Sequence, residues 1–175
     1  LHLCWHYVAS FYACLAARFQ ALCRISFLYF SLSTTLADVP MAKIFCVANQ
    51  KGGVGKTTTS VNLAAGLAAV GQRVLLVDLD PQGNATMGSN VDKRSLAHSV
   101  YGVLIEAVTV AQARVRAEKC GYDVLGANRE LAGAEVELVD VDRREKRLKA
   151  ALAAVDSEYD FVLIDCPPAL SLLTL

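Results

Sequence analysis

The sequence predicts an α/β fold in which a mostly parallel sheet carries helices on both faces. Residues 43–48, 73–78 and 161–165 are short apolar runs without alternation, as expected of strands that are buried on both faces. A helical pattern follows the first run, and another precedes the third. Aspartates end the second and third runs, at the carboxyl edge where open α/β sheets bind ligands.

Length and composition limit the possible functions. The chain has 175 residues, about one ordinary domain. Its 17 basic residues balance its 17 acidic residues, so overall charge attracts neither nucleic acid nor an anionic membrane. The cysteines show no C-x-x-C spacing and no nearby histidine cluster, which gives no support for zinc or iron–sulfur ligation. Unpaired thiols favour a reducing cytosol.

Residues 1–40 differ in composition from the rest of the chain. They are rich in aromatic side chains, and Arg18, Arg24 and Asp38 are their only charges. The arginines leave no uncharged window of the roughly 20 residues that a membrane-spanning helix needs, and they lie inside the apolar stretch, unlike those of a secretory signal. We expect residues 1–40 to be an apolar leader outside the fold, placed before a true start at Met41. A membrane or targeting segment and a genuine part of the fold are the alternatives.

The elements of the fold are expected in a regular order after Met41. The strand at 43–48 is followed by a helix at 56–70, which ends at Gly71, and by the strand at 73–78. Before the last strand, at 161–165, the patterns predict a turn-rich segment (81–90), moderately helical segments (95–107 and 110–119), a possible short strand (122–127) and helices (129–139 and 142–155). The charge run within 142–155 predicts a solvated helix face, with a contact surface for a partner as the alternative.

A glycine-rich loop joins the first strand to the first helix. Its sequence is Asn49-Gln50-Lys51-Gly52-Gly53-Val54-Gly55-Lys56-Thr57-Thr58. Glycines allow successive backbone N–H groups to point inward, and the helix start adds partial positive charge beneath a bound phosphate. Lys56 is expected along the β and γ phosphates of a nucleotide, and the Thr57 hydroxyl is expected to bind Mg²⁺. The sequence therefore predicts a nucleotide-binding P-loop.

One departure from the usual P-loop pattern is informative. Position 50 is Gln rather than Gly, and a second lysine, Lys51, stands beside the loop. Two lysines at one site are unfavourable unless negative charge lies against them. The loop resembles the deviant Walker A sequence K-G-G-x-G-K-T/S, found in partitioning ATPases, cell-division site regulators and nitrogenase iron protein. The resemblance implies that Lys51 reaches the phosphates held by a partner subunit, so that ATP binding promotes homodimerisation.

The aspartates that follow the second and third strands complete the predicted site. Asp78 and Asp80 lie at the carboxyl end of the second strand, and Asp165 ends the third. The alternative from the residues alone is helix capping or turn formation. By the family resemblance, Asp80 orients the attacking water, Asp78 supports the magnesium shell, and Asp165 is the Walker B aspartate. Lys51, Lys56 and Asp80 are then the catalytic residues; the loop from Lys51 to Thr58 binds ATP, and Thr57, Asp78 and Asp165 serve Mg²⁺.

Two segments resemble one branch of this family in particular. The sequence from Val77 to Thr86 and the Asp165-Cys166-Pro167-Pro168 motif are similar to the chromosome-partitioning ATPases of the ParA/Soj group. The resemblance covers residues 41–175, loosely in the middle. It implies a Mg²⁺-dependent, cytoplasmic and nucleoid-associated ATPase that dimerises on ATP and binds DNA non-specifically. Such a protein segregates chromosome or plasmid DNA together with a centromere-binding partner of the ParB type.

The chain stops at Leu175, shortly after the Walker B strand, whereas family members continue through further strands and helices. We therefore expect residues 41–175 to be the N-terminal part of the ATPase domain. The later part would carry the adenine pocket, much of the dimer surface and the DNA-binding residues. A sheet without those strands leaves apolar edges uncovered, so poor solubility is expected. The alternative functions are a membrane-associated division-site or cargo-positioning ATPase and a non-functional fragment.

Overall fold

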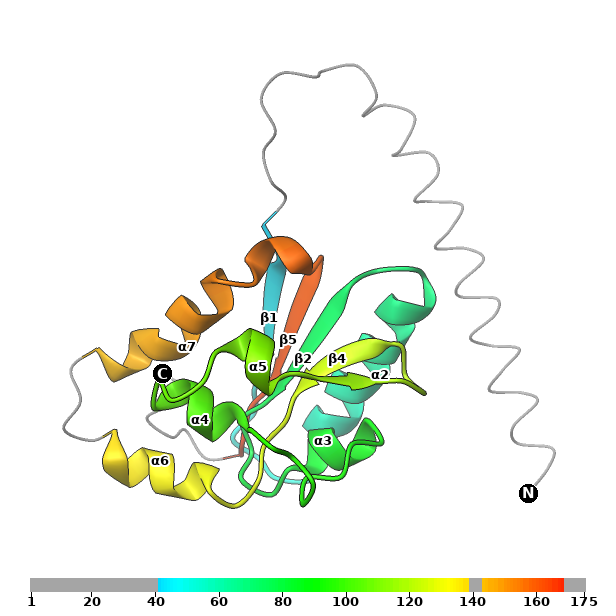
Figure 1. The fold of residues 1–175 in the computed structure, drawn as a ribbon. Coiled ribbons are helices and arrows are strands. Elements are labelled where there is room, and N and C mark those ends of the chain that lie inside the picture. The colour runs from blue at the N-terminus through cyan, green and yellow to red at the C-terminus, as the bar shows by residue number, and fades with distance from the viewer. Residues whose placement is uncertain (1–40, 139–142, 169–175) are drawn as a thin grey trace. The chain divides into compact units, whose positions relative to one another are not determined.

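The computed structural model describes residues 41–138 and 143–168. Figure 1 shows the arrangement of the elements. The strands are β1 (Lys43–Val47), β2 (Val74–Asp78), β3 (Val115–Ala117), β4 (Tyr122–Leu125) and β5 (Phe161–Asp165). The helices are α2 (Lys56–Ala69), α3 (Asn84–Gly88), α4 (Val100–Leu104), α5 (Val110–Ala113), α6 (Leu131–Glu137) and α7 (Arg144–Ala153), and a 3-10 turn spans Asp156–Glu158.

The strands form one mostly parallel sheet in the order β1-β5-β2-β4-β3. β5 lies between β1 and β2, parallel to both, and β4 is parallel to β2. Only the β3–β4 pair, among the described strands, is antiparallel. The register sets Asp78 of β2 beside Asp165 of β5. The predicted α/β fold is confirmed, and both strand-end aspartates lie at the same edge of the sheet.

Helices pack on both faces of this sheet, as Figure 1 shows. On one face, α2 and α3 cover Leu76 and Leu163. On the other, the segments α4 to α7 cover Leu75, Val77 and Ile164. Side chains alternate between the faces along each strand, so an unbroken apolar run supplies both cores. β2 and β5 are buried in this way, as the sequence predicts.

The first strand is different, and there the prediction of burial on both faces is wrong. Four of the five residues of β1 are exposed, with Ile44 at 47% and Phe45 at 49% relative exposure. The physical reason is position: β1 lies at an edge of the sheet and pairs only with β5 among the described strands. The expectation of poor solubility agrees with such an edge and stays a prediction.

Two segments of the middle region also depart from the sequence prediction. The turn-rich segment at 81–90 contains the short helix α3, and the predicted helix at 110–119 stops at Ala113 before the strand β3. Pairing of Val115 with Val124 across the hairpin stabilises the extended form there. The predicted strand at 122–127 and the helices at 129–139 and 142–155 are present with shorter limits. Residues 139–142, like the leader at 1–40, lie outside the described residues.

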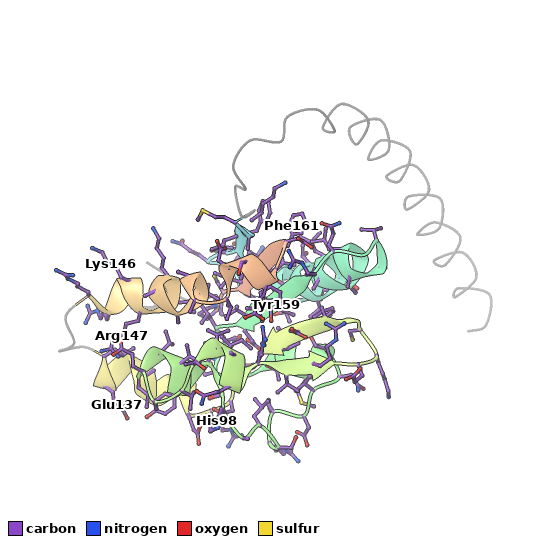
Figure 2. All side chains as sticks on the ribbon, turned by 45° about the horizontal axis from the view of Figure 1, so that its top comes forward. His98, Glu137, Lys146, Arg147, Tyr159 and Phe161 are labelled. Carbon is purple, nitrogen blue, oxygen red and sulfur yellow. The ribbon has the colours of Figure 1, made fainter. Side chains whose placement is uncertain are left out.

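The charge run on α7 has two sides, which Figure 2 labels at Lys146 and Arg147. Arg147 is half-buried, donates to the backbone oxygen of Leu104 at 2.8 Å and pairs with Glu106 at 3.6 Å. Lys146 and Lys149 are exposed. The predicted solvated face is therefore present. Arg147, within the same charge run, connects α7 to the end of α4. Within the described residues, no helix is long and apolar enough to cross a membrane.

Candidate phosphate-binding site

The glycine-rich loop runs from the end of β1 to the start of α2, where its backbone conformation depends on glycine. Gly55 precedes α2 with a φ of 88°, in the left-handed region that side chains disfavour. Its carbonyl oxygen accepts the first helical hydrogen bond, from the Thr59 N–H at 2.8 Å. At the other end, the Lys51 N–H donates to Asn49 Oδ1 at 2.9 Å. The positive end of α2 therefore points at this loop.

A cavity of about 360 Å³ lies beside the loop at the carboxyl edge of the sheet. Residues from both predicted parts of the site line it: Gly53, Gly55, Lys56, Thr57, Thr58 and Asp80, joined by Gln82, Asn84, Cys166 and Pro168. The structure thus brings the loop and Asp80 together around one space. Lys51, Gly52 and Val54 are exposed and are not among the residues that line this cavity. Their assigned roles in nucleotide binding stay predictions.

Asp165 is buried at the end of β5, against the first turns of α2. Thr57 Oγ1 donates to its Oδ2 at 2.8 Å, and Ser60 Oγ donates to its Oδ1 at 2.9 Å. Burial raises the pKa of this carboxyl above its usual range, and the two hydroxyl donors partly oppose that shift. Both carboxylate oxygens of Asp165 therefore accept a hydrogen bond from α2. The donor to Oδ2, Thr57, also belongs to the glycine-rich loop sequence.

Asp78 lies next to Asp165 in the sheet register but makes a separate set of bonds. Its Oδ2 accepts from the backbone N–H and the hydroxyl of Thr86, both at 2.8 Å, and its Oδ1 accepts from the Asp80 N–H at 3.0 Å. Burial raises the pKa of Asp78 to about 6, despite these donors. The side chain fixes α3 and the backbone of Asp80. Its support of a magnesium shell stays a prediction.

Asp80 stands at the cavity, at the start of a tight turn. The Gln82 N–H donates to Asp80 Oδ1 at 2.9 Å, and the Gly83 N–H donates to the Asp80 carbonyl oxygen at 2.8 Å. One carboxylate oxygen thus orients the turn. The other, Oδ2, accepts none of these bonds, which is the arrangement needed to contact a water molecule in the cavity.

The residues present fit a magnesium ion bound with a nucleotide. Thr57 Oγ1 and Asp165 Oδ2 are 2.8 Å apart beside the cavity, and a hydroxyl with a nearby carboxylate suits Mg²⁺, which keeps several waters and takes its other ligands from phosphate. Within the described ranges, no group of three or more His, Cys, Asp and Glu side chains is placed to hold a metal on its own. Such an ion would be held by Thr57, with Asp165 acting on its water shell.

Six residues of this site are not among those that the sequence predicts, and they include Cys166 and Pro168 of the cavity lining. Ser60 and Thr86 orient the aspartates, while Gln82 and Asn84 line the cavity. Ser60 carries a usable signal, because it follows Thr57 by three residues and so lies on the same face of a helix. Thr86 carries no such signal in the sequence, since its hydrogen bonds to Asp78 depend on how the chain folds after the turn.

Comparisons with known proteins agree with this geometry. A family model described as an AAA domain (AAA_31) matches residues 42–175. The chain is 53% identical over 135 residues to the sporulation initiation inhibitor protein Soj of Bacillus subtilis, covering 77% of this chain and 53% of Soj. It is 47% identical over 135 residues to the chromosome partitioning protein ParA of Myxococcus xanthus, covering 77% of this chain and 48% of ParA. The chain thus spans about half the length of the curated relatives it matches.

Among solved structures, the fold is similar to cobyrinic acid a,c-diamide synthase from Mycobacterium smegmatis with a bound ATP analogue and magnesium. The TM-score is 0.74 and the identity 49%, over 76% of this chain and 54% of that one. This neighbour holds the two ligands for which the cavity and its donor set are suited.

Proposed function

Because the chain belongs to the ParA/Soj family of AAA-domain P-loop ATPases, we propose that it hydrolyses ATP with Mg²⁺ and acts in the partitioning of DNA. The observation that carries the proposal is the meeting of Thr57 and Asp165 beside the phosphate loop, with Lys56 and Asp80 on the same cavity. Relatives and a structural neighbour with a bound ATP analogue support the same chemistry.

The reaction that this site suits is attack of water on the γ-phosphate. The loop amides and Lys56 would bind the phosphates and stabilise negative charge as the terminal bond breaks. Asp80 would hold the attacking water through its Oδ2. Thr57 would bind Mg²⁺ and Asp165 would act on its water shell, and the ion would neutralise charge at the phosphates. No strong base is required in a loose transition state, so a carboxylate that positions water is sufficient.

We also propose which partners this protein has. Lys51 is exposed at the loop, in agreement with a role across a dimer interface formed on ATP binding. We propose that the ATP-bound dimer binds DNA non-specifically on the nucleoid, in the cytoplasm, and that a centromere-binding protein of the ParB type resets it. The 17 basic residues of the chain balance its 17 acidic residues, so its overall charge does not attract DNA, and a DNA-binding surface within it would have to be a local patch.

The test is ATP turnover and ATP binding by the full-length protein. Lys56→Ala is expected to lose ATP binding, whereas Asp80→Ala should bind ATP but release phosphate about 100-fold more slowly, as when one transition-state contact is removed. Lys119→Ala, at an exposed lysine away from the cavity, is the matched control. Unchanged turnover in both site variants would reject the assigned roles. A wild-type protein that stays monomeric with ATP in light scattering would reject the dimer.

A second candidate is ATP-dependent amide formation, which the 49% identity to the cobyrinic acid a,c-diamide synthase structure favours. Both reactions begin with ATP at the same loop, so the site alone separates them poorly. Phosphate release without glutamine or a carboxylic acid acceptor is expected for the partitioning ATPase. Release that requires both compounds would favour amide formation.

A further inference from the structure

The turn that carries Asp80 is held from outside the cavity by a lysine that the proposed mechanism does not use. Lys93, in the segment after α3, donates from Nζ to the backbone oxygen of Gln82. The N–H of the same residue, Gln82, donates to Asp80 Oδ1 at 2.9 Å. The peptide units on either side of Gln82 therefore connect the ammonium group to the Asp80 carboxylate.

The stem of Lys93 also packs against this turn. Gly83 has a φ of 63°, and a Cβ at that position would lie 2.8 Å from Lys93 Cδ and 2.6 Å from the backbone oxygen of Ala127. The turn is thus enclosed between Lys93 and the segment that follows β4. Lys93 is half-buried as a residue, while its ammonium bond to Gln82 lies at the exposed surface.

Space is available for the turn to move if this bond is lost. A second cavity, of about 500 Å³, lies on the outer side of the turn and is lined by Pro81, Gln82, Lys93 and Arg129. The Asp80 carbonyl bond to the Gly83 N–H, at 2.8 Å, closes the turn but does not fix it to the rest of the fold. Attachment to the rest of the fold comes from Asp78 on the inner side, from the Met87 N–H bond to the Gly83 carbonyl oxygen at 3.1 Å, and from Lys93 on the outer side.

We propose that Lys93 is a positioning residue for Asp80, which keeps the Asp80 carboxylate directed at the phosphate cavity through its bond to Gln82. This inference rests on the proposed ATPase function and on the role given to Asp80 there. Lys93 does not line the phosphate cavity. Its loss should therefore lower the rate of hydrolysis and leave ATP binding intact, because a small misplacement of a reacting group is costly to the rate.

The experiment measures kcat, KM and mant-ATP binding for the full-length protein. Lys93→Met keeps the apolar stem on Gly83 and removes the ammonium, and we expect a fall in kcat of about tenfold with KM within about twofold of wild type. Lys93→Arg restores a donor and should recover most of the rate. Arg94→Met, at the exposed neighbouring residue, is the matched control and should behave as wild type.

A double variant separates positioning from a general loss of structure. If Lys93 acts through Asp80, then Lys93→Met adds nothing further in an Asp80→Ala background. An equal tenfold loss in that background overturns the proposal, as does a wild-type kcat in Lys93→Met or a change confined to KM. If the proposed role of Asp80 in ATP hydrolysis is wrong, the result differs from these outcomes, because Asp80→Ala alone would then hydrolyse ATP at the wild-type rate.

Discussion

β1 and β2 are both five-residue parallel strands with apolar sequences, and β5 alone lies between them. Every residue of β2 is buried, whereas four of the five in β1 are exposed. The local sequence makes each segment extended, but the number of neighbouring strands and covering helices decides burial. An apolar run is therefore good evidence for a strand and weak evidence for its surroundings.

The largest expected effect compares one core side chain on each strand. Leu76 of β2 is fully buried, so Leu76→Ala should lower the free energy of unfolding by about 2 to 5 kcal/mol through lost transfer energy and a cavity. Ile44 of β1 is 47% exposed, and Ile44→Ala should cost about 1 kcal/mol. Urea unfolding of both variants measures the difference. Equal losses would mean that β1 is covered in the protein in solution.

The second prediction concerns the carboxyl end of β2, where burial acts on a charge. Burial raises the pKa of Asp78 to about 6, compared with 3.8 for the same carboxyl group in the unfolded chain. The folded state therefore binds the proton of the Asp78 carboxyl group more tightly than the unfolded state does. The folded chain therefore binds more protons between these values, and the free energy of unfolding falls as pH rises through that range. At about 1.4 kcal/mol per pKa unit, the total is about 3 kcal/mol.

Asp78→Asn tests this assignment in urea unfolding at several pH values. The amide cannot accept at both oxygen positions, so the variant should lose about 1 to 3 kcal/mol relative to wild type near pH 4, and this loss should shrink as the pH rises towards 6 because the variant carries no buried charge. The fall in stability from about pH 4 to about pH 6 should become shallower. Glu118→Gln, at an exposed carboxyl, is the control and should keep the wild-type slope. A wild-type slope in Asp78→Asn would assign the pH dependence to other groups.

These contrasts explain how far the sequence could predict the site. Gly55, Lys56 and Thr57 form a local pattern at a strand–helix junction, and Asp165 ends a strand, so their meeting at one sheet edge is predictable from topology. The partnership of Ser60 with Asp165 joins residues 105 positions apart and depends on how α2 packs on the sheet. Val115 adopts a strand because Val124 pairs with it, which a local pattern does not record.

The smallest effect compares two thiols at neighbouring positions of the sheet and costs little stability. Cys46 of β1 is exposed, whereas Cys166, just after β5, is 6% exposed, and burial raises the pKa of its thiol to about 11. Only the thiolate reacts readily, so iodoacetamide at pH 8 should label Cys46 at least about tenfold faster than Cys166. Mass spectrometry of the two peptides gives both rates in one sample.

Because Cys166 also lines the phosphate cavity, its protection from labelling should increase further when ATP and Mg²⁺ are added, while the labelling rate at Cys46 stays the same. Similar rates at the two thiols without nucleotide would show that the end of β5 opens as readily as the exposed strand, and would remove the contrast between the two regions.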